Sequence, residues 1–240
     1  MRKGFWTRAA GFAIFGIAAQ ALALPPAEVG SGPDGGAAVG QAESRLIDRV
    51  VAVVEGQVIT QSELEFETRV ALVQHGAVQA ASAPLDERTM KASLDYVIGQ
   101  RLHAAEAEKL QAFVLDEGEV DQALSQFEEK IGGRTSLQEF LAANEADRQS
   151  LGVVVARSLR AERILDSKIR LRAQVSDADV RRYYDAHASE LNGTWEDLRP
   201  VLKEKLVRDR YTELAQAEMQ QLRRAASVRI IAAPGEGAGR

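Results

Sequence analysis

The chain has 240 residues, of which 45% are hydrophobic, 5% aromatic and 27% charged, with a formal net charge of −5 at pH 7. It contains no Cys, which excludes disulfides, thiolate nucleophiles, Cys-ligated zinc, iron–sulfur clusters and a lipidated N-terminal cysteine. The acidic balance argues against nucleic acid as a partner, because non-specific binding usually shows as a basic footprint. Three scattered His residues leave little material for a metal site, so we expect no metal and no cofactor.

Residues 1–23 have the pattern of a secretory signal peptide. A positively charged start precedes an apolar run at 9–19, and a small-x-small pattern ends at Ala23. The run is shorter than the roughly 20 residues that span a bilayer. We therefore predict cleavage near Leu24, no stable membrane anchor afterwards and a periplasmic or secreted protein. Retention of the segment as an anchor is the alternative.

Residues 24–44 are rich in Pro and Gly and offer little branched apolar surface, which predicts a flexible linker. Residues 232–240 have a similar composition and are predicted to form a flexible tail. The ordered domain is therefore expected at residues 45–231.

The domain opens with a β-branched run at 49–54, a Glu55-Gly56 turn and a second short β-rich piece at 57–59. This order predicts a hairpin. The next residues, Thr60 to Glu63, form a capping box, so a helix should follow to about Val73.

Between Leu85 and Arg199 the chain has no Pro, and its Ala, Leu, Glu, Gln and Arg content favours helices throughout. We expect one helix to end at Gly132-Gly133. A second capping box at Ser136 to Glu139 should open a short helix, and a long helix should follow at 146–172. Apolar residues recur at helical spacing, and they are Met90, Leu94, Val97, Ile98 and Leu102 in the first segment and Val120, Leu124, Phe127 and Ile131 in the next.

Ser176 can cap another helix, and Thr194 can cap a final long helix to about Ala225. Pro200 lies too deep for the first turn, which predicts a kink or a later start. The closing β-branched piece at 227–231 has no partner except the hairpin, and an isolated hairpin is marginal in water. We therefore predict a mostly α fold, a single helical domain closed by a small sheet of the N-terminal hairpin and a C-terminal strand.

No nucleophile–base pair stands out, so we predict no catalytic residues. His75 lies at a predicted helix end, where a protonated ring would suit the helix dipole. His103 and His187 are interpreted as surface or hydrogen-bonded core residues. The acidic group at 116–119 is interpreted as a helix first turn rather than a cation site. The basic run between Arg157 and Arg172 is interpreted as a solvated helix face.

Residues 48–64, DRVVAVVEGQVITQSEL, resemble the opening of SurA-type periplasmic chaperones, in which a hydrophobic strand, an Asn- or Glu-Gly turn, a short strand and a Thr-x-Ser-Glu-Leu helix start follow one another. Related PrsA- and PpiD-type foldases open similarly. The resemblance continues less tightly through 94–102, 119–131 and the acidic start at Val175. It implies a SurA N-terminal-like chaperone domain and a role in outer membrane protein assembly.

One departure from that family concerns activity. A parvulin-type prolyl-isomerase domain is commonly inserted there before the last long helix, whereas here the join is only 191–195. The resemblance therefore implies the chaperone core without isomerase activity.

The function we predict is an ATP-independent chaperone that binds unfolded or newly secreted polypeptides and is not an enzyme. Apolar and aromatic side chains would contact the client, and the peptide-binding residues that we predict are Phe66, Val70, Phe127, Phe140 and Tyr184. The alternatives are an envelope assembly protein that binds one specific folded partner, and an unconventional peptidyl-prolyl isomerase. The sequence leaves the oligomeric state open, a homodimer included.

Overall fold

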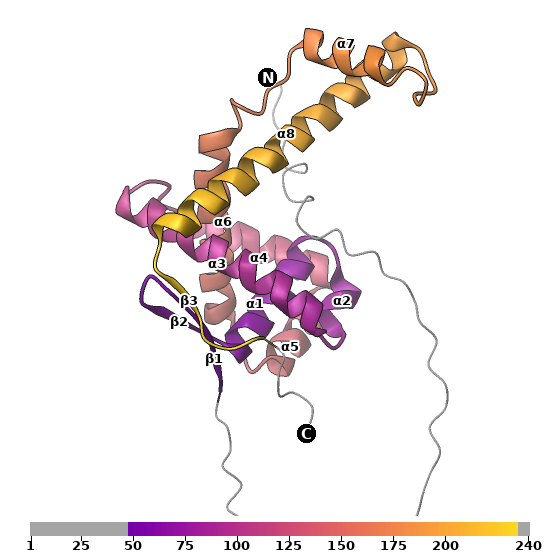
Figure 1. The fold of residues 1–240 in the computed structure, drawn as a ribbon. Coiled ribbons are helices and arrows are strands. Elements are labelled where there is room, and N and C mark those ends of the chain that lie inside the picture. Colours follow the sequence, from indigo (N-terminus) through magenta and orange to yellow (C-terminus); the bar gives the residue numbers. More distant parts are fainter. Residues whose placement is uncertain (1–47, 235–240) are drawn as a thin grey trace, which may run out of the picture. The chain divides into compact units, whose positions relative to one another are not determined.

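The computed structural model describes residues 48–234, so the predicted signal peptide and linker and the end of the tail lie outside the described residues. Within this range the fold is mostly helical with one small sheet (Figure 1). The helices are α1 (Gln61–Gln74), α2 (Val78–Ser82), α3 (Glu87–Lys109), α4 (Glu117–Ile131), α5 (Arg134–Ala143), α6 (Arg148–Ile169), α7 (Asp177–Ala186) and α8 (Trp195–Ala225).

The sheet has three antiparallel strands in the order β2-β1-β3, where β1 is Val50–Val54, β2 is Gln57–Thr60 and β3 is Val228–Ile230. Glu55 and Gly56 both have positive φ angles, 49° and 83°, as the common two-residue hairpin turn requires. The predicted hairpin and its C-terminal third strand are therefore confirmed. In Figure 1 the first and last described segments lie side by side in this sheet.

The main core lies between the sheet and α3. Fully buried β-branched residues of β1 and β2 pack against one face of α3, the face that the sequence spacing predicts. Its members on α3 are Met90, Leu94, Val97, Ile98 and Leu102. A second, smaller core joins α7 to α8 around Val175, Val180 and Leu202.

Local sequence signals fix most helix starts. Thr60 and Ser176 cap α1 and α7 through complete capping boxes, and Asp116 caps α4 in the same way. The capping box expected at Ser136 is wrong, because α5 already begins at Arg134. Gly133 turns the chain with a φ of 96° directly after α4 ends, which leaves Ser136 inside the helix.

Helix α8 is capped by Thr194 and runs through Pro200, so the later start that we considered is wrong. The cap bond to the Asp197 N–H holds the first turn although proline lacks one backbone donor. Further along, α8 crosses α3 closely. A Cβ built on Gly99 would lie 2.1 Å from the Met219 Cε, so a larger residue there would have to displace the flexible end of the Met219 side chain.

A buried group of charges ties three helices to the sheet. The Glu67 Oε1 on α1 accepts a hydrogen bond from Arg101 on α3 at 2.8 Å and pairs with Arg157 on α6 at 2.5 Å. Arg101 also donates to the carbonyl of Val58 in β2 at 2.9 Å. Glu67 and Arg101 are only 5% and 7% exposed, so water cannot replace a lost partner.

We expect Arg101→Met to lower the free energy of unfolding by about 3–5 kcal/mol, because it leaves the Glu67 carboxylate buried with one partner fewer. Urea unfolding followed by circular dichroism measures the change. Arg88→Met is the matched control on the same helix, since Arg88 is exposed, and it should change stability by less than about 0.5 kcal/mol. Equal effects of the two substitutions would contradict a structural role for the buried charges.

Ending the chain after Ala226 removes β3 and should cost about 3 kcal/mol of a stability that is about 5–15 kcal/mol in most domains. The truncation deletes the β1–β3 ladder and uncovers Ala52 and Val54, which β3 flanks. Thermal unfolding measures the loss, and a chain that ends after Pro234 serves as the control. An unchanged melting temperature of the chain that ends after Ala226 would show that β3 does not close the fold.

Candidate functional site

Four of the five predicted peptide-binding residues lie in the core. The ring of Phe140 on α5 lies 6.1 Å from that of Phe66 on α1 and 5.6 Å from that of Phe127 on α4, measured between centroids. Val70 on α1 is fully buried. All four are at most 9% exposed. In this conformation the three Phe rings connect α1, α5 and α4, and none of the four side chains is accessible to a peptide. Their peptide-binding role stays a prediction.

Tyr184, the fifth residue, belongs to a half-buried aromatic cluster between α7 and α8. Its ring meets that of Trp195 edge to face at 5.6 Å, and its hydroxyl donates to the carbonyl of Gly193 at 3.2 Å. The guanidinium of Arg181 lies 5.7 Å and 5.1 Å from the two ring centroids, which is cation–π distance. Next to this pair, Tyr183 stacks on His187 at 4.1 Å.

Carboxylates at the start of α7 hold this cluster in place. Asp179 accepts hydrogen bonds from the Ser176 hydroxyl and backbone N–H and pairs with Arg182, and these contacts lower the pKa of Asp179 to about 2. Asp177 pairs with Lys203 and Arg199 of α8, which lowers its pKa as well. The start of α7 is therefore anchored to α8 by charge as well as by apolar contact.

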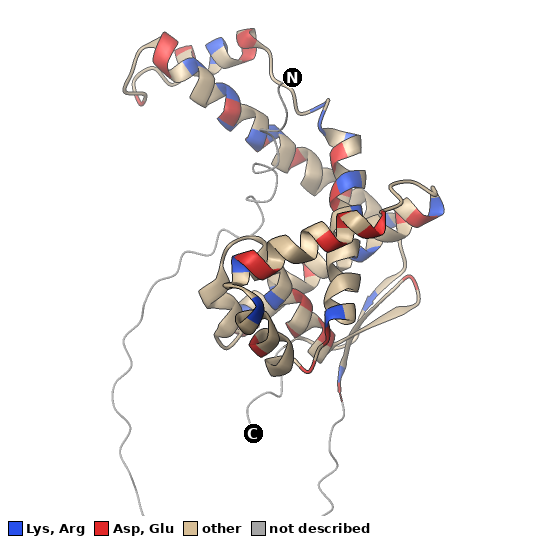
Figure 2. Ribbon diagram, turned by 180° about the vertical axis from the view of Figure 1, so that it is seen from behind, with Lys and Arg blue, Asp and Glu red and all other residues tan. Residues whose placement is uncertain are grey.

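The interpretation of the basic run at 157–172 as a solvated helix face is wrong for four of its cations, whereas Arg170 and Arg172 are exposed. Four of its cations bridge to carboxylates on other helices, namely Arg157 to Glu67, Arg160 to Glu108, Arg163 to Glu119, and Lys168 to Glu106 and Glu218. Figure 2 shows acidic and basic residues interspersed along the helices rather than segregated on one side.

The histidines show no arrangement for catalysis. Burial lowers the pKa of His75, which disfavours the protonated ring that a charge–dipole interaction at this helix end would need. His103 is 3% exposed, and its ring nitrogens have no hydrogen-bond partner among the described residues. Burial lowers its pKa too. Among residues 48–234 no group of three or more metal-ligating side chains comes together.

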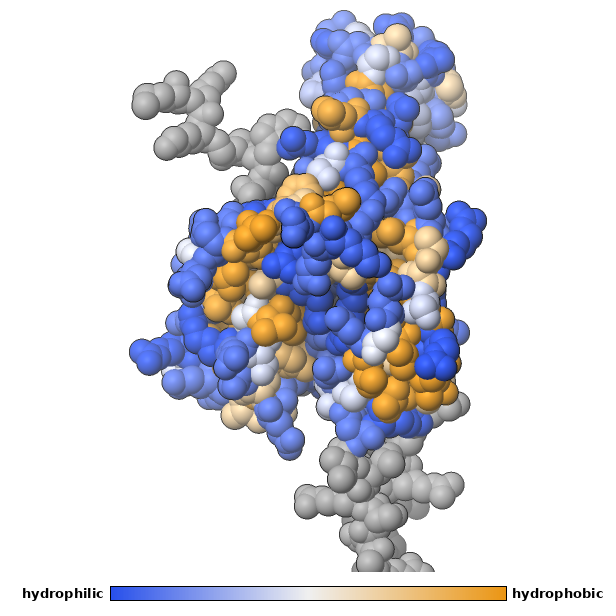
Figure 3. All heavy atoms as spheres, turned by 90° about the vertical axis from the view of Figure 1, so that its left-hand side faces the viewer, coloured by the Kyte–Doolittle hydropathy of each residue, from blue (hydrophilic) through white to orange (hydrophobic). Residues whose placement is uncertain are grey.

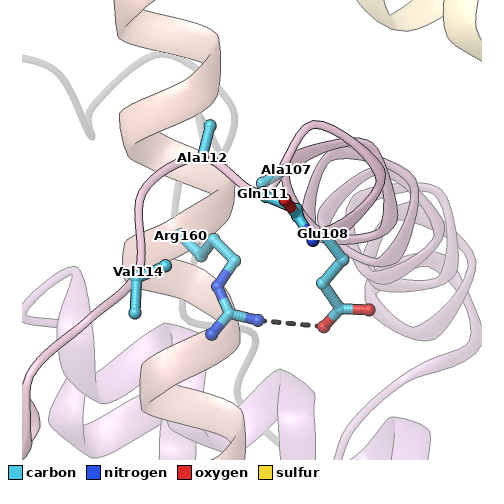
Figure 4. A pocket seen from close by; sticks show the side chains of 6 residues that line it. All are labelled: Ala107, Glu108, Gln111, Ala112, Val114 and Arg160. Carbon is cyan, nitrogen blue, oxygen red and sulfur yellow. Dashed lines mark hydrogen bonds and ion pairs between the residues drawn. The ribbon is translucent and has the colours of Figure 1, made fainter.

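A shallow hollow lies where α3 ends, beside α6 (Figure 4). Its volume is about 360 Å³, and its apolar lining comes from Ala107, Ala112 and Val114. The ion pair of Arg160 with Glu108, 2.9 Å long, lies at its edge. Near it the loop after α3 exposes two apolar side chains, 63% of Leu110 and 80% of Val114. Sequence reasoning missed this surface, although apolar residues between two predicted helices could have suggested it.

The hydrophobic surface on one face of the described part is divided into patches. On the face shown in Figure 3, separate hydrophobic areas alternate with hydrophilic ones, and no single apolar groove runs across that face. None of the described helices combines the length and the apolar character that crossing a bilayer demands. Contact with another chain at this surface would therefore be spread over several small sites.

Comparison with known proteins finds sequence similarity to a protein named as a chaperone. No family model matches the chain. The chain is 30% identical over 148 residues to the protein named Chaperone SurA from Chromohalobacter salexigens. The match covers 60% of this chain and 33% of that relative, so the chain corresponds to about a third of the relative's length. The resemblance to SurA-type chaperones noted in the sequence is thereby confirmed.

Asp179→Ala should loosen the α7–α8 aromatic cluster at neutral pH, because it removes the capping box and the pair with Arg182. A carboxyl whose pKa falls on folding stabilises the fold above its unfolded pKa, and this stabilisation disappears as the pH falls through the folded pKa. The difference from the unsubstituted chain should therefore vanish between about pH 4 and pH 2.

Trp195 fluorescence in a Trp6→Phe background reports this loosening, because the chain has two Trp residues. Asp121→Ala is the control, since Asp121 is an exposed carboxylate on α4 and takes no part in the α7–α8 cluster. A variant difference that persists at pH 2 would contradict the role given to the Asp179 carboxylate.

Proposed function

We propose that this chain is an ATP-independent chaperone domain that holds unfolded or newly secreted polypeptides. The observation that carries the proposal is the 148-residue similarity to Chaperone SurA. A periplasmic or secreted location follows from the signal-peptide pattern of residues 1–23 and is part of the same proposal.

Holding would use several weak apolar contacts rather than one deep site. The hollow beside Val114, the exposed Leu110 and the aromatic cluster at Tyr184 each offer apolar area bordered by charge. Apolar burial contributes about 25 cal/mol per Å², and ordering the client offsets part of it. Release needs no nucleotide, because the client's own folding competes for the same apolar side chains.

The proposal includes the absence of prolyl-isomerase activity. The segment between α7 and α8 consists of residues 187–194, which is too short to hold a further domain at that point. A single folded envelope partner is the competing function, and it predicts binding without general protection of unfolded proteins.

The full chain should suppress the aggregation of several unrelated, chemically unfolded proteins without ATP. It should leave prolyl cis–trans exchange, which takes tens to hundreds of seconds uncatalysed, unchanged. Light scattering measures the first and a proline-containing peptide assay the second.

The double substitution Leu110→Ser and Val114→Ser should weaken holding by about tenfold, given the apolar area that it removes. Leu171→Ser is the matched control, because Leu171 is 82% exposed at the end of α6 and does not line the hollow. Protection of no client together with tight binding to one folded protein would replace this proposal by the assembly function. Accelerated exchange would show that the chain is an enzyme.

A further inference from the structure

The two edges of the sheet differ. In an antiparallel ladder, residues alternate between pointing their backbone groups at the neighbouring strand and away from it. The β1–β2 register turns the carbonyl of Val58 outward, and Arg101 already donates to it at 2.9 Å. The edge at β2 is therefore occupied by a side chain of the domain itself.

The edge at β3 is open within residues 48–234. Ser227 and Ile231 share backbone hydrogen bonds with Glu55 and Val51, so the backbone groups of Val228 and Ile230 point away from β1. No strand among the described residues pairs with that side. An open edge of this kind is a ready template for another extended chain.

Side chains at this edge favour an added strand. Ile230 lies opposite Ala52, on the face that carries the buried core, and yet it is 55% exposed. A strand beside β3 would cover it and extend the apolar face of the sheet. On the other face, Arg229 is exposed and pairs with no acidic side chain in the described part of the chain. A strand that alternates apolar with acidic residues would satisfy both faces.

A second copy of the chain does not fit this edge. Two copies of β3 paired antiparallel about its middle residue would set Arg229 directly opposite Arg229, and like charges facing each other across strands are destabilising. We propose that the β3 edge binds an extended segment of a client polypeptide by strand addition, with β-branched residues against Ile230 and an acidic residue beside Arg229. The choice of a client polypeptide as the partner rests on the proposed holding function. The open edge itself rests only on the strand pairing.

Strand addition depends on backbone hydrogen bonds, and this property provides the test. The probe is a fluorescently labelled octapeptide that alternates Val with Thr and Glu, and its control is the same peptide with alternate backbone nitrogens methylated. Anisotropy titration with the full chain should show binding of the first and at least about tenfold weaker binding of the second. Equal affinity for both peptides, or no binding of the unmethylated one, would overturn the proposal.

Ile230→Pro removes an outward N–H without removing a hydrogen bond to β1, and it should weaken peptide binding by about tenfold. Ile230→Val keeps the donor and should change the affinity by less than about threefold. If the proline variant unfolds, Ile230→Lys decides the matter, because a charge at the edge opposes strand addition and leaves the ladder intact. Unchanged affinity of a folded Ile230→Pro or Ile230→Lys variant would exclude peptide binding at this edge.

The aggregation assay separates the two proposals. A chain that protects unfolded clients but binds both peptides equally is a chaperone without an edge site. A chain that discriminates between the peptides but protects no client has the edge site without the holding function.

Discussion

The arrangement of α1, α3 and α6 depends on the ion pairs that the buried carboxylate of Glu67 forms. Two guanidinium groups from different helices meet it, and one of these, Arg101, also reaches the backbone of β2. Removing one partner of a buried ion pair is destabilising because the remaining charge is neither paired nor hydrated. The cluster therefore joins α1, α3 and α6 to one another and, through Arg101, to the sheet. Its excess of positive charge is partly offset by Glu63, 3.5 Å from Arg101.

Elements that depend on neighbouring residues could be predicted from the sequence. The turn at Glu55-Gly56, the capping boxes at Thr60 and Ser176 and the helix end at Gly132 all rest on local backbone chemistry, and all are found. The start of α5 could not be predicted in the same way, because a plausible capping box at Ser136 competed with the turn at Gly133. The sequence pattern therefore allows a helix start at either position, and the turn at Gly133 after α4 selects the earlier start at Arg134.

The candidate site was harder to predict, since exposure is a property of the whole fold. Phe127 and Phe140 have the spacing of helix-face residues, which is the same for a core and for a binding surface. Arg157 and Glu67 lie on different helices, and nothing in either segment marks the other as its partner. Tyr184 kept partial exposure because α7 packs mainly on a single helix, α8, and this follows from the topology rather than from its neighbours in sequence.

The pairing of β3 with β1 also has a consequence for the order of events during folding. The backbone N–H of Ser227 donates to the carboxylate of Glu55, 172 residues away in sequence. A contact between residues so far apart in sequence carries a large loop-closure entropy cost and forms late in folding. It cannot form before Ser227 has been synthesised. The helices can form on the way, but closure of the sheet waits for the last strand. The β3 side of β1 therefore stays unpaired until residues 228–230 have been synthesised.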